Sequence, residues 1–300
     1  MACKGSQGVS PAAPINEEEA KLNTLESEEG NKVCNDLFID ANSLSYNGYR
    51  IVKLKKKLRY EYSPEMKAKP DLIDVFYTVL KRNGNILAEF DGFYYGIGNS
   101  NDFGLFAFLG GKTKQLFITQ AAPRSGRHWI VDLSTRFRVI FDSYEYQVGR
   151  EEFWITDLDR DGVYEIIFGD PSFYMVFEGL SMAETPLPET IFKYDAHRKK
   201  YLPANHLFQG YALNGIEDEI TKLKSEHEQG YLSHRLEILL RYIYAGKQDE
   251  GWAFFDKEYQ LKDKEDVKVQ VKEVLNKHPF YRFIYGRTRS SSRALTERSK

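Results

Sequence analysis

The stretch Glu151–Gly169 reads EEFWITDLDRDGVYEIIFG and places carboxylates at the alternate positions Asp157, Asp159 and Asp161, followed at once by Gly162. Aromatic and β-branched residues flank this run on both sides, which favours strands rather than helices. Alternating carboxylates that end in a glycine supply hard oxygen ligands of the kind that Ca²⁺ prefers. We therefore expect a β-hairpin whose loop carries one metal site.

Working outward, the region from about Tyr49 to Leu213 reads as one strand after another. Asn-Gly at 83–84 lies between two apolar runs, which is a strong hairpin signal. Gly110-Gly111 and the 133–136 turn separate two further pairs of runs. The segment Tyr49–Tyr62 alternates but is rich in lysine, which is typical of a strand at the edge of a sheet.

These hairpins predict a repeated unit. The segment Leu105–Gln120 has the outline of Phe153–Gly169, and each is followed by a second hairpin, at His128–Phe141 and Thr190–Leu202; the hairpin Thr78–Phe90 looks like the second half of an earlier copy. Repeats of four strands are typical of propeller blades. The β region is short for a closed ring of at least about four blades. We expect two to four propeller-like sheets, and both a closed and an incomplete ring stay open.

After Gly215 the apolar period changes to that of helices. Ile216, Ile220 and Leu223 predict a short helix, and the run from Leu232 to Ile243 predicts a longer one with Ser233 as its N-cap and Gly246 as its stop. Two more helices are expected at Trp252–Tyr259 and Val267–Leu275. A single helix–turn–helix of tetratricopeptide outline cannot bury its own face, so this part is expected to pack against the β region.

The loop itself resembles the FG-GAP/VCBS repeat loop of integrin-α-type propellers. The resemblance implies Ca²⁺ coordination by the side chains of Asp157, Asp159, Asp161 and Glu165 and by the backbone carbonyl of Val163. Glu165 stands where that family usually has aspartate. An EF-hand would need helical flanks and a glutamate at the twelfth position.

The twelfth position is Phe168, so the EF-hand is excluded. The alternative to a metal site is an acidic turn without an ion. The sister loop at Gly110-Gly111 has lysines and no carboxylate, so no second site of this kind is expected. No nucleophile elbow, phosphate loop or histidine metal motif is found, and no catalytic residue can be named.

Composition limits the partners. The net charge is −2 over 300 residues, which argues against nucleic acid, and no apolar run is long enough to span a membrane. The opening residues Met1–Ser6 resemble the start of a mature bacterial lipoprotein, in which Cys3 would carry the lipid. This resemblance implies a location in the cell envelope, lipid-anchored and periplasmic or extracellular. The alternative is a cytoplasmic chain with free thiols.

We therefore expect four parts: a polar tether (1–40), a mainly β domain with the Ca²⁺ loop (41–213), a C-terminal helical unit (214–285) and a basic tail (286–300). The interpretation that the resemblance favours is a non-enzymatic binding or assembly module that presents loops to a protein or glycan partner. One alternative is a glycan-directed hydrolase with carboxylates from different blades. Another is that the helical unit grips a peptide in a groove.

Overall fold

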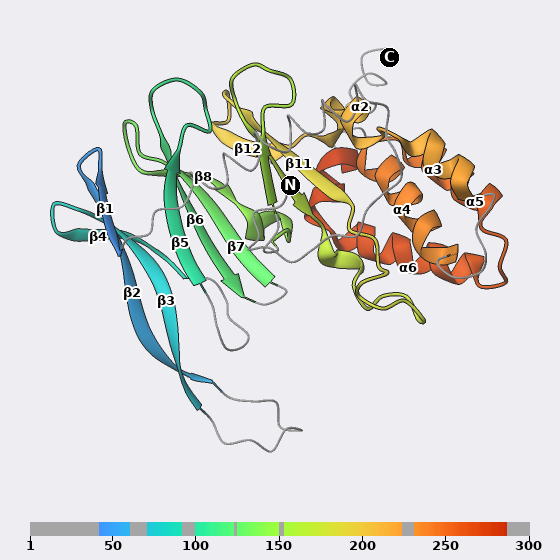
Figure 1. Cartoon of the computed structure of the whole chain (residues 1–300), viewed down its shortest axis with the longest axis horizontal. Coiled ribbons are helices and arrows are strands. Elements are labelled where there is room, and N and C mark those ends of the chain that lie inside the picture. The colour runs from blue at the N-terminus through green and yellow to red at the C-terminus, as the bar shows by residue number, and fades with distance from the viewer. Residues whose placement is uncertain are drawn as a thin grey trace, which may run out of the picture. The chain divides into compact units, whose positions relative to one another are not determined.

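The structure, a computed structural model, describes residues 42–60, 71–91, 100–122, 125–149, 153–223 and 231–286. Antiparallel sheets come first along the chain and helices follow (Figure 1). The expected tether with Cys3 lies outside the described residues, and so does the basic tail after Gly286. In the part of the chain that is described, no helix combines the length and the apolar character needed to cross a membrane.

Three four-stranded antiparallel sheets make up the β part, and each is built from four strands that are consecutive in the sequence. This arrangement confirms a mainly β chain with four-stranded units and a C-terminal α part. The first sheet contains β1 (Ser43–Tyr46), β2 (Tyr49–Tyr60), β3 (Asp71–Arg82) and β4 (Asn85–Phe90). The second contains β5 (Ser100–Phe106), β6 (Gln115–Ala122), β7 (Ser125–Asp132) and β8 (Arg138–Asp142), and the third β9 (Phe153–Thr156), β10 (Glu165–Gly169), β11 (Glu189–Asp195) and β12 (Lys200–Pro203).

The hairpin turns follow the expected chemistry. Asn83 and Gly84 have φ angles of 51° and 81°, the left-handed pair that a two-residue hairpin turn requires. Asn47 and Gly48, at 51° and 75°, make the same turn between β1 and β2. The hairpin pairs identified in the sequence fall at matching places, with β5–β6 and β9–β10 opening the second and third sheets and β7–β8 and β11–β12 following them.

The prediction that Tyr49–Tyr62 forms an edge strand was wrong for its first four residues. β2 lies between β1 and β3, because the short strand β1 pairs with its first four residues, from Tyr49 to Val52. The lysine-rich remainder of β2 continues to pair with β3 as far as Tyr60, opposite Asp71. The lysine-rich part of β2 therefore begins where its pairing with β1 ends. Positive residues are common along such an open edge.

The first two sheets share one apolar core. Buried side chains of both sheets form a single cluster that includes Ile51, Leu80, Leu116 and Trp129. The rings of Phe90 and Trp129 meet edge to face with their centroids 5.5 Å apart. Burial of these side chains is the main favourable contribution to packing one sheet on the other.

The opposite face of the second sheet carries a second aromatic layer. Phe117 and His128 are fully buried there, and both rings lie about 5 Å from the ring of Phe153 in β9, with centroid distances of 5.0 and 5.2 Å. The Nδ1 atom of His128 lies 2.9 Å from the hydroxyl of Thr119, so the buried imidazole has a polar partner. This histidine is a packing residue.

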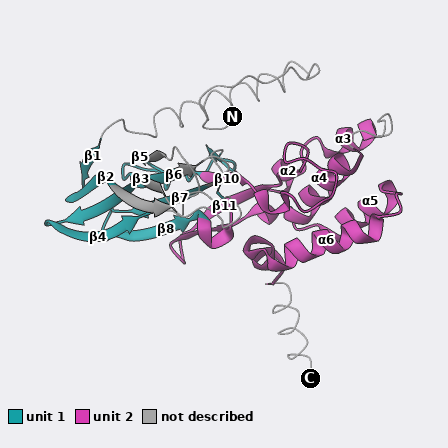
Figure 2. Cartoon of the chain, turned by 90° about the horizontal axis from the view of Figure 1, so that it is seen from below, with its two compact units in different colours: residues 1–143, 149–164 teal, residues 144–148, 165–300 magenta. Residues whose placement is uncertain are grey.

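The contacts divide the chain into two compact units (Figure 2). Unit 1 comprises Met1–Ser143 and Gly149–Tyr164, and unit 2 comprises Tyr144–Val148 and Glu165–Lys300. Unit 2 therefore joins the strands β10–β12 to the helices. Its 3-10 turns are η2 (Ser143–Tyr146), η3 (Pro171–Phe173) and η4 (Asn205–Leu207). The first residue of η2, Ser143, belongs to unit 1.

The helices of unit 2 match the expected apolar periods. They are α2 (Gln209–Ala212), α3 (Ile216–Lys222), α4 (Tyr231–Tyr244), α5 (Gln248–Glu258) and α6 (Lys264–Lys277). Gly246 ends α4 as predicted: its N–H donates to the Ile243 carbonyl, the N–H of Lys247 donates to Tyr242, and its φ is 84°. The N-cap prediction was wrong, because α4 begins at Tyr231 and the Ser233 hydroxyl donates instead to the backbone carbonyl of Glu184.

Candidate metal site

The acidic loop between β9 and β10 is shaped by its own side chains. The carboxylate of Asp157 accepts the backbone N–H groups of Asp161 and Gly162, at 3.0 and 2.9 Å. Asp161 in turn accepts the N–H of Val163 at 2.8 Å. Arg160 and Gly162 have left-handed φ angles of 59° and 84°, so the chain turns sharply at the glycine as the sequence predicts.

Three of the predicted ligands come together. Asp157, Asp159 and Glu165 can each offer one carboxylate oxygen such that all three atoms lie within 4.8 Å of one another. Asp157 is half-buried, Asp159 is exposed and Glu165 is fully buried. Asp161 is not in this group, and its role as a ligand, like that of the Val163 carbonyl, stays a prediction.

The spacing of these oxygens fits a calcium ion. Protein oxygens bind Ca²⁺ at about 2.3–2.6 Å, so two oxygens on one ion can be no further apart than about 5 Å. The three carboxylate oxygens meet that limit. They are also hard ligands, without a nitrogen or sulfur atom that would select zinc or copper. The donor set therefore suits Ca²⁺.

Glu165, the buried carboxylate of the group, also forms an ion pair with a lysine. The Nζ atom of Lys193 in β11 lies 2.9 Å from an oxygen of Glu165. The register of β10 and β11 pairs Ile166 with Phe192, and extending it by one position sets Lys193 opposite Glu165. A buried carboxylate without a cation would be costly, and Lys193 supplies a positive charge beside Glu165 in this structure.

The sequence pattern did not identify Lys193 as a neighbour of the acidic loop. The signal that could have found it is cross-strand charge pairing, because opposite charges stabilise antiparallel neighbours. That signal becomes usable only when the register of the two strands is known.

The sister loop of the second sheet lies against the acidic loop. A Cβ atom on Gly110 would be only 2.5 Å from the backbone oxygen of Gly162, so the two backbones approach as only glycine permits. The N–H of Tyr164 also donates to the carbonyl of Phe108 at 2.8 Å. The acidic loop is thus held in place from outside itself.

A separate polar cluster is buried in unit 2. One oxygen of Asp170 accepts the N–H of Ser172 at 2.8 Å, which caps η3. The other accepts the hydroxyl of Tyr244 and lies 3.3 Å from Nε2 of His278. Burial raises the pKa of Tyr244 well above its usual range, and the Asp170 charge raises it further. Burial lowers the pKa of His278, although Asp170 opposes that shift.

This cluster contains a carboxylate, a histidine and a tyrosine hydroxyl, but it lines neither of the two surface hollows described in unit 2. The three side chains are almost entirely inaccessible. We interpret the cluster as a structural link between η3 and the ends of α4 and α6.

Comparison with known proteins identifies no relative. No family model, curated protein or solved structure matches this chain.

Proposed function

We propose that this chain is a binding or assembly module in which Ca²⁺ stiffens the β9–β10 loop. The observation that carries the proposal is the group of three carboxylates whose oxygens lie within 4.8 Å. Asp157, Asp159 and Glu165 would hold the ion, with Asp161 and the Val163 carbonyl as the further ligands that the FG-GAP/VCBS resemblance implies. The bound ion would supply positive charge to a loop dense in carboxylates.

The three meander sheets are, in this proposal, blade-like repeats of propeller type. Support comes from their construction, since each sheet uses four consecutive strands and the first two share a core. The loops that connect the strands would be the surfaces offered to a protein or glycan partner. The opening residues around Cys3 favour a lipid-anchored protein of the bacterial cell envelope.

The size of the ion's contribution argues for a structural role. Calcium sites of extracellular modules have Kd values of about 10⁻⁴–10⁻³ M, so about 1 mM Ca²⁺ would add roughly 0.4–1.4 kcal/mol to the free energy of unfolding. That is enough to order a loop and too little to create the fold.

Thermal unfolding tests the proposal. Addition of 1 mM Ca²⁺ after EDTA treatment is expected to raise Tm by about 1–6 °C, given roughly 2–4 °C per kcal/mol for a chain of this size. Asp159→Asn should abolish the rise, because it removes one of the three carboxylates that would hold the ion. Asp218→Asn, an exposed aspartate of α3, is the matched control and should keep it. A Tm that does not respond to Ca²⁺ would remove the metal from the proposal.

A further inference from the structure

Unit 2 has a surface groove of about 390 Å³ that shares no lining residue with the acidic loop. One face of α6 forms a wall, through residues Asp263, Asp266, Val267 and Gln270, which are spaced at helical intervals. Leu232 at the start of α4 contributes to the lining, and so does the connection that follows η3.

The floor of the groove is apolar. Phe177 and Val267 line it and are each only 4% exposed, so they belong to the packed interior as well. Val269 lies at the rim with 54% of its surface exposed. A partner that covers this rim would remove apolar surface from water, which favours binding.

The polar part of the lining is acidic. Glu178, Asp263 and Asp266 contribute carboxylates, and among the described residues no lysine or arginine lines the groove. Asp263 accepts the hydroxyl of Tyr259 at 3.0 Å, which leaves its negative charge uncompensated. Glu178 and Asp266 make no ion pair with any residue that the structure describes.

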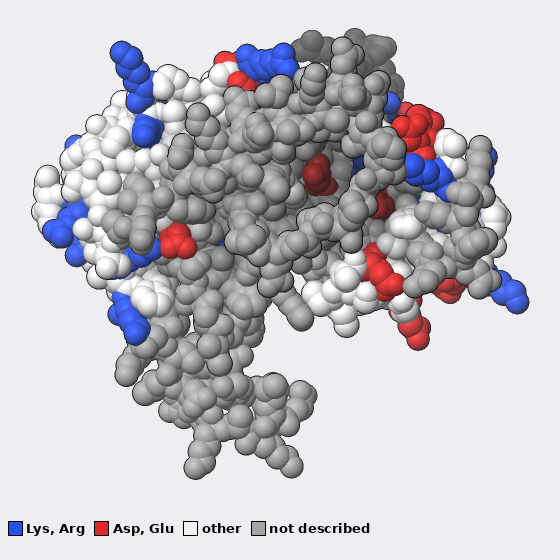
Figure 3. Space-filling model, viewed as in Figure 1, with Lys and Arg blue, Asp and Glu red and all other residues white. Residues whose placement is uncertain are grey.

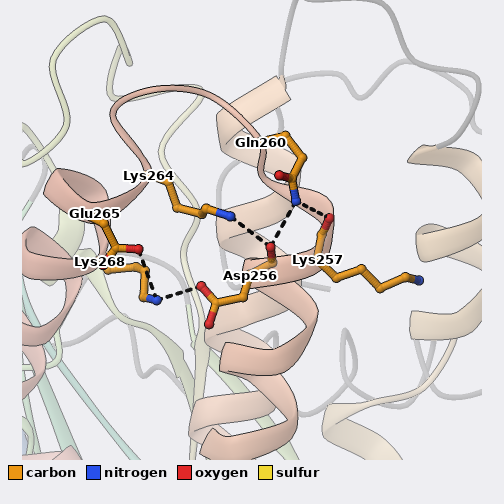
Figure 4. Close-up of polar contacts among 6 residues, drawn as sticks. All are labelled: Asp256, Lys257, Gln260, Lys264, Glu265 and Lys268. Atoms are coloured by element: carbon orange, nitrogen blue, oxygen red, sulfur yellow. Dashed lines mark hydrogen bonds and ion pairs between the residues drawn. The ribbon is translucent and has the colours of Figure 1, made fainter.

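Two lysines of α6, Lys264 and Lys268, reach toward the end of α5 (Figure 4). Lys268 pairs with the Asp256 carboxylate at 2.6 Å, and Lys264 donates to the Asp256 backbone carbonyl at 2.9 Å. Gln260 donates to the same carbonyl and to that of Lys257, so these side chains together satisfy the C-terminal end of α5. Lys264 and Lys268 are therefore committed to the end of α5.

Helix geometry alone does not account for this distribution. Acidic side chains at the start of a helix are favoured by its dipole, which explains Asp263 and Asp266. Glu178 belongs to a connection and not to α6, yet it faces the same groove. On the face shown in Figure 3, acidic side chains also gather at the end where Figure 1 shows the helices.

We propose that this groove binds a cationic amphipathic segment of a partner protein, with lysine or arginine side chains meeting the three carboxylates and apolar side chains covering Val269 and Phe177. Charge complementarity favours such a segment over an acidic one, and the apolar floor favours it over a purely polar one. The groove shares no residue with the acidic loop, so this inference goes beyond the proposed function and does not depend on Ca²⁺.

The test uses a fluorescein-labelled 16-residue peptide with lysine and leucine at helical spacing, measured by anisotropy against the full chain in EDTA. Saturable one-to-one binding is expected, and it should weaken as salt screens the charges. Each exposed ion pair changes Kd by about two- to fivefold. The double variant D263N/D266N should therefore raise Kd about four- to twenty-fivefold.

Matched controls separate the groove from general acidity. D249N/E250Q removes two exposed carboxylates from the first turn of α5, outside the groove, and should change Kd less than twofold. For the apolar rim, Val269→Asn should weaken binding, whereas Leu261→Asn should not, although Leu261 is equally exposed at 52%. Equal effects in both members of either pair would overturn the proposal.

Two further results would also overturn it. A peptide with glutamate in place of every lysine should not bind, and comparable affinity for it would exclude a cationic partner. The chain's own basic tail is the other candidate occupant, with Arg287, Arg289 and Arg293 near its start. If R287Q/R289Q/R293Q in the full chain tightens probe binding more than threefold, the tail and not a partner protein occupies the groove.

Discussion

At the scale of single residues, Gly110 shows how closely the acidic loop is held. Its φ is 70°, and a Cβ atom there would lie 2.5 Å from the Gly162 carbonyl oxygen. Gly111, next in the chain, has nearly the same φ of 69° but open space around its Cβ position. Both positions therefore favour glycine because of their backbone conformation, but only Gly110 also lacks the space for a side chain.

We predict that Gly110→Ala lowers the free energy of unfolding by about 2–4 kcal/mol, because it adds a clash to the cost of a left-handed alanine. Gly111→Ala pays the conformational cost alone, about 1 kcal/mol, and part of it is offset by the stiffer unfolded chain. Urea denaturation of both variants measures the difference. Equal destabilisation would show that the close approach to Gly162 is not present in solution.

A second prediction concerns His278, whose pKa is lowered by burial more than the Asp170 carboxylate raises it. The unfolded chain therefore takes up a proton at this position at a higher pH than the folded chain does. The free energy of unfolding should decrease as the pH falls below about 7, through the unfolded pKa near 6.5. The raised pKa of Tyr244 keeps its hydroxyl protonated throughout this range.

His278→Gln should flatten this pH dependence by up to about 1.4 kcal/mol per pH unit between pH 7 and 5, the value for one proton. Burial also raises the pKa of Glu189, which acts in the opposite direction but equally in both proteins. The difference between the two stability profiles isolates His278. Parallel profiles would contradict the prediction.

At the scale of elements, the α4–α5 pair depends on a close approach that the sequence pattern does not reveal. A Cβ on Gly251 of α5 would lie 2.9 Å from Cβ of Tyr242 and 3.1 Å from the Leu239 carbonyl oxygen, both on α4. Gly210 in α2 has open space at the same position. Alanine is the better helix former at both sites by about 1 kcal/mol. Packing therefore decides whether a Gly→Ala substitution stabilises or destabilises the chain.

Gly251→Ala is predicted to destabilise the chain by about 1–3 kcal/mol, because the two helices must separate. Gly210→Ala is predicted to be neutral or to stabilise by up to about 1 kcal/mol. Thermal or urea unfolding checks both. A stabilising Gly251→Ala would mean that α4 and α5 do not pack closely at this point.

Element types could be read from the sequence where local chemistry determines them. The Asn83-Gly84 turn and the stop at Gly246 were predicted because each needs only a left-handed φ at one residue or at two adjacent ones. The strand β1 was missed because it has only four residues, and Ser233 was misassigned because its hydroxyl binds a carbonyl distant in sequence. Tertiary contacts of that kind leave no trace in a local pattern.

In the candidate site, too, the sequence predicts what is local and does not predict the tertiary contacts. Asp157, Asp159 and Glu165 were identified from spacing alone, because a loop of nine residues can bring its own ends together. The pairing of Glu165 with Lys193 and the support from Gly110 could not be predicted, since both depend on which strands and loops become neighbours.

At the scale of the whole molecule, the repeat of four strands was visible in the sequence because hairpin turns recur at similar spacing. The structure has three such sheets, and unit 2 combines strands of the last one with the helices. A chain of this construction has two surfaces with different chemistry: an acidic loop suited to a hard cation and an acidic groove suited to a cationic segment. Their tests are independent.

The central claim is that the loop from Asp157 to Glu165 binds one Ca²⁺, and isothermal titration calorimetry tests it most directly. The chain stripped with EDTA and then freed of the chelator should bind one equivalent of Ca²⁺ with a Kd of about 10⁻⁴–10⁻³ M, and D157N/D159N should not bind. No saturable binding by the unmodified chain, or the same binding by D157N/D159N, would contradict the account.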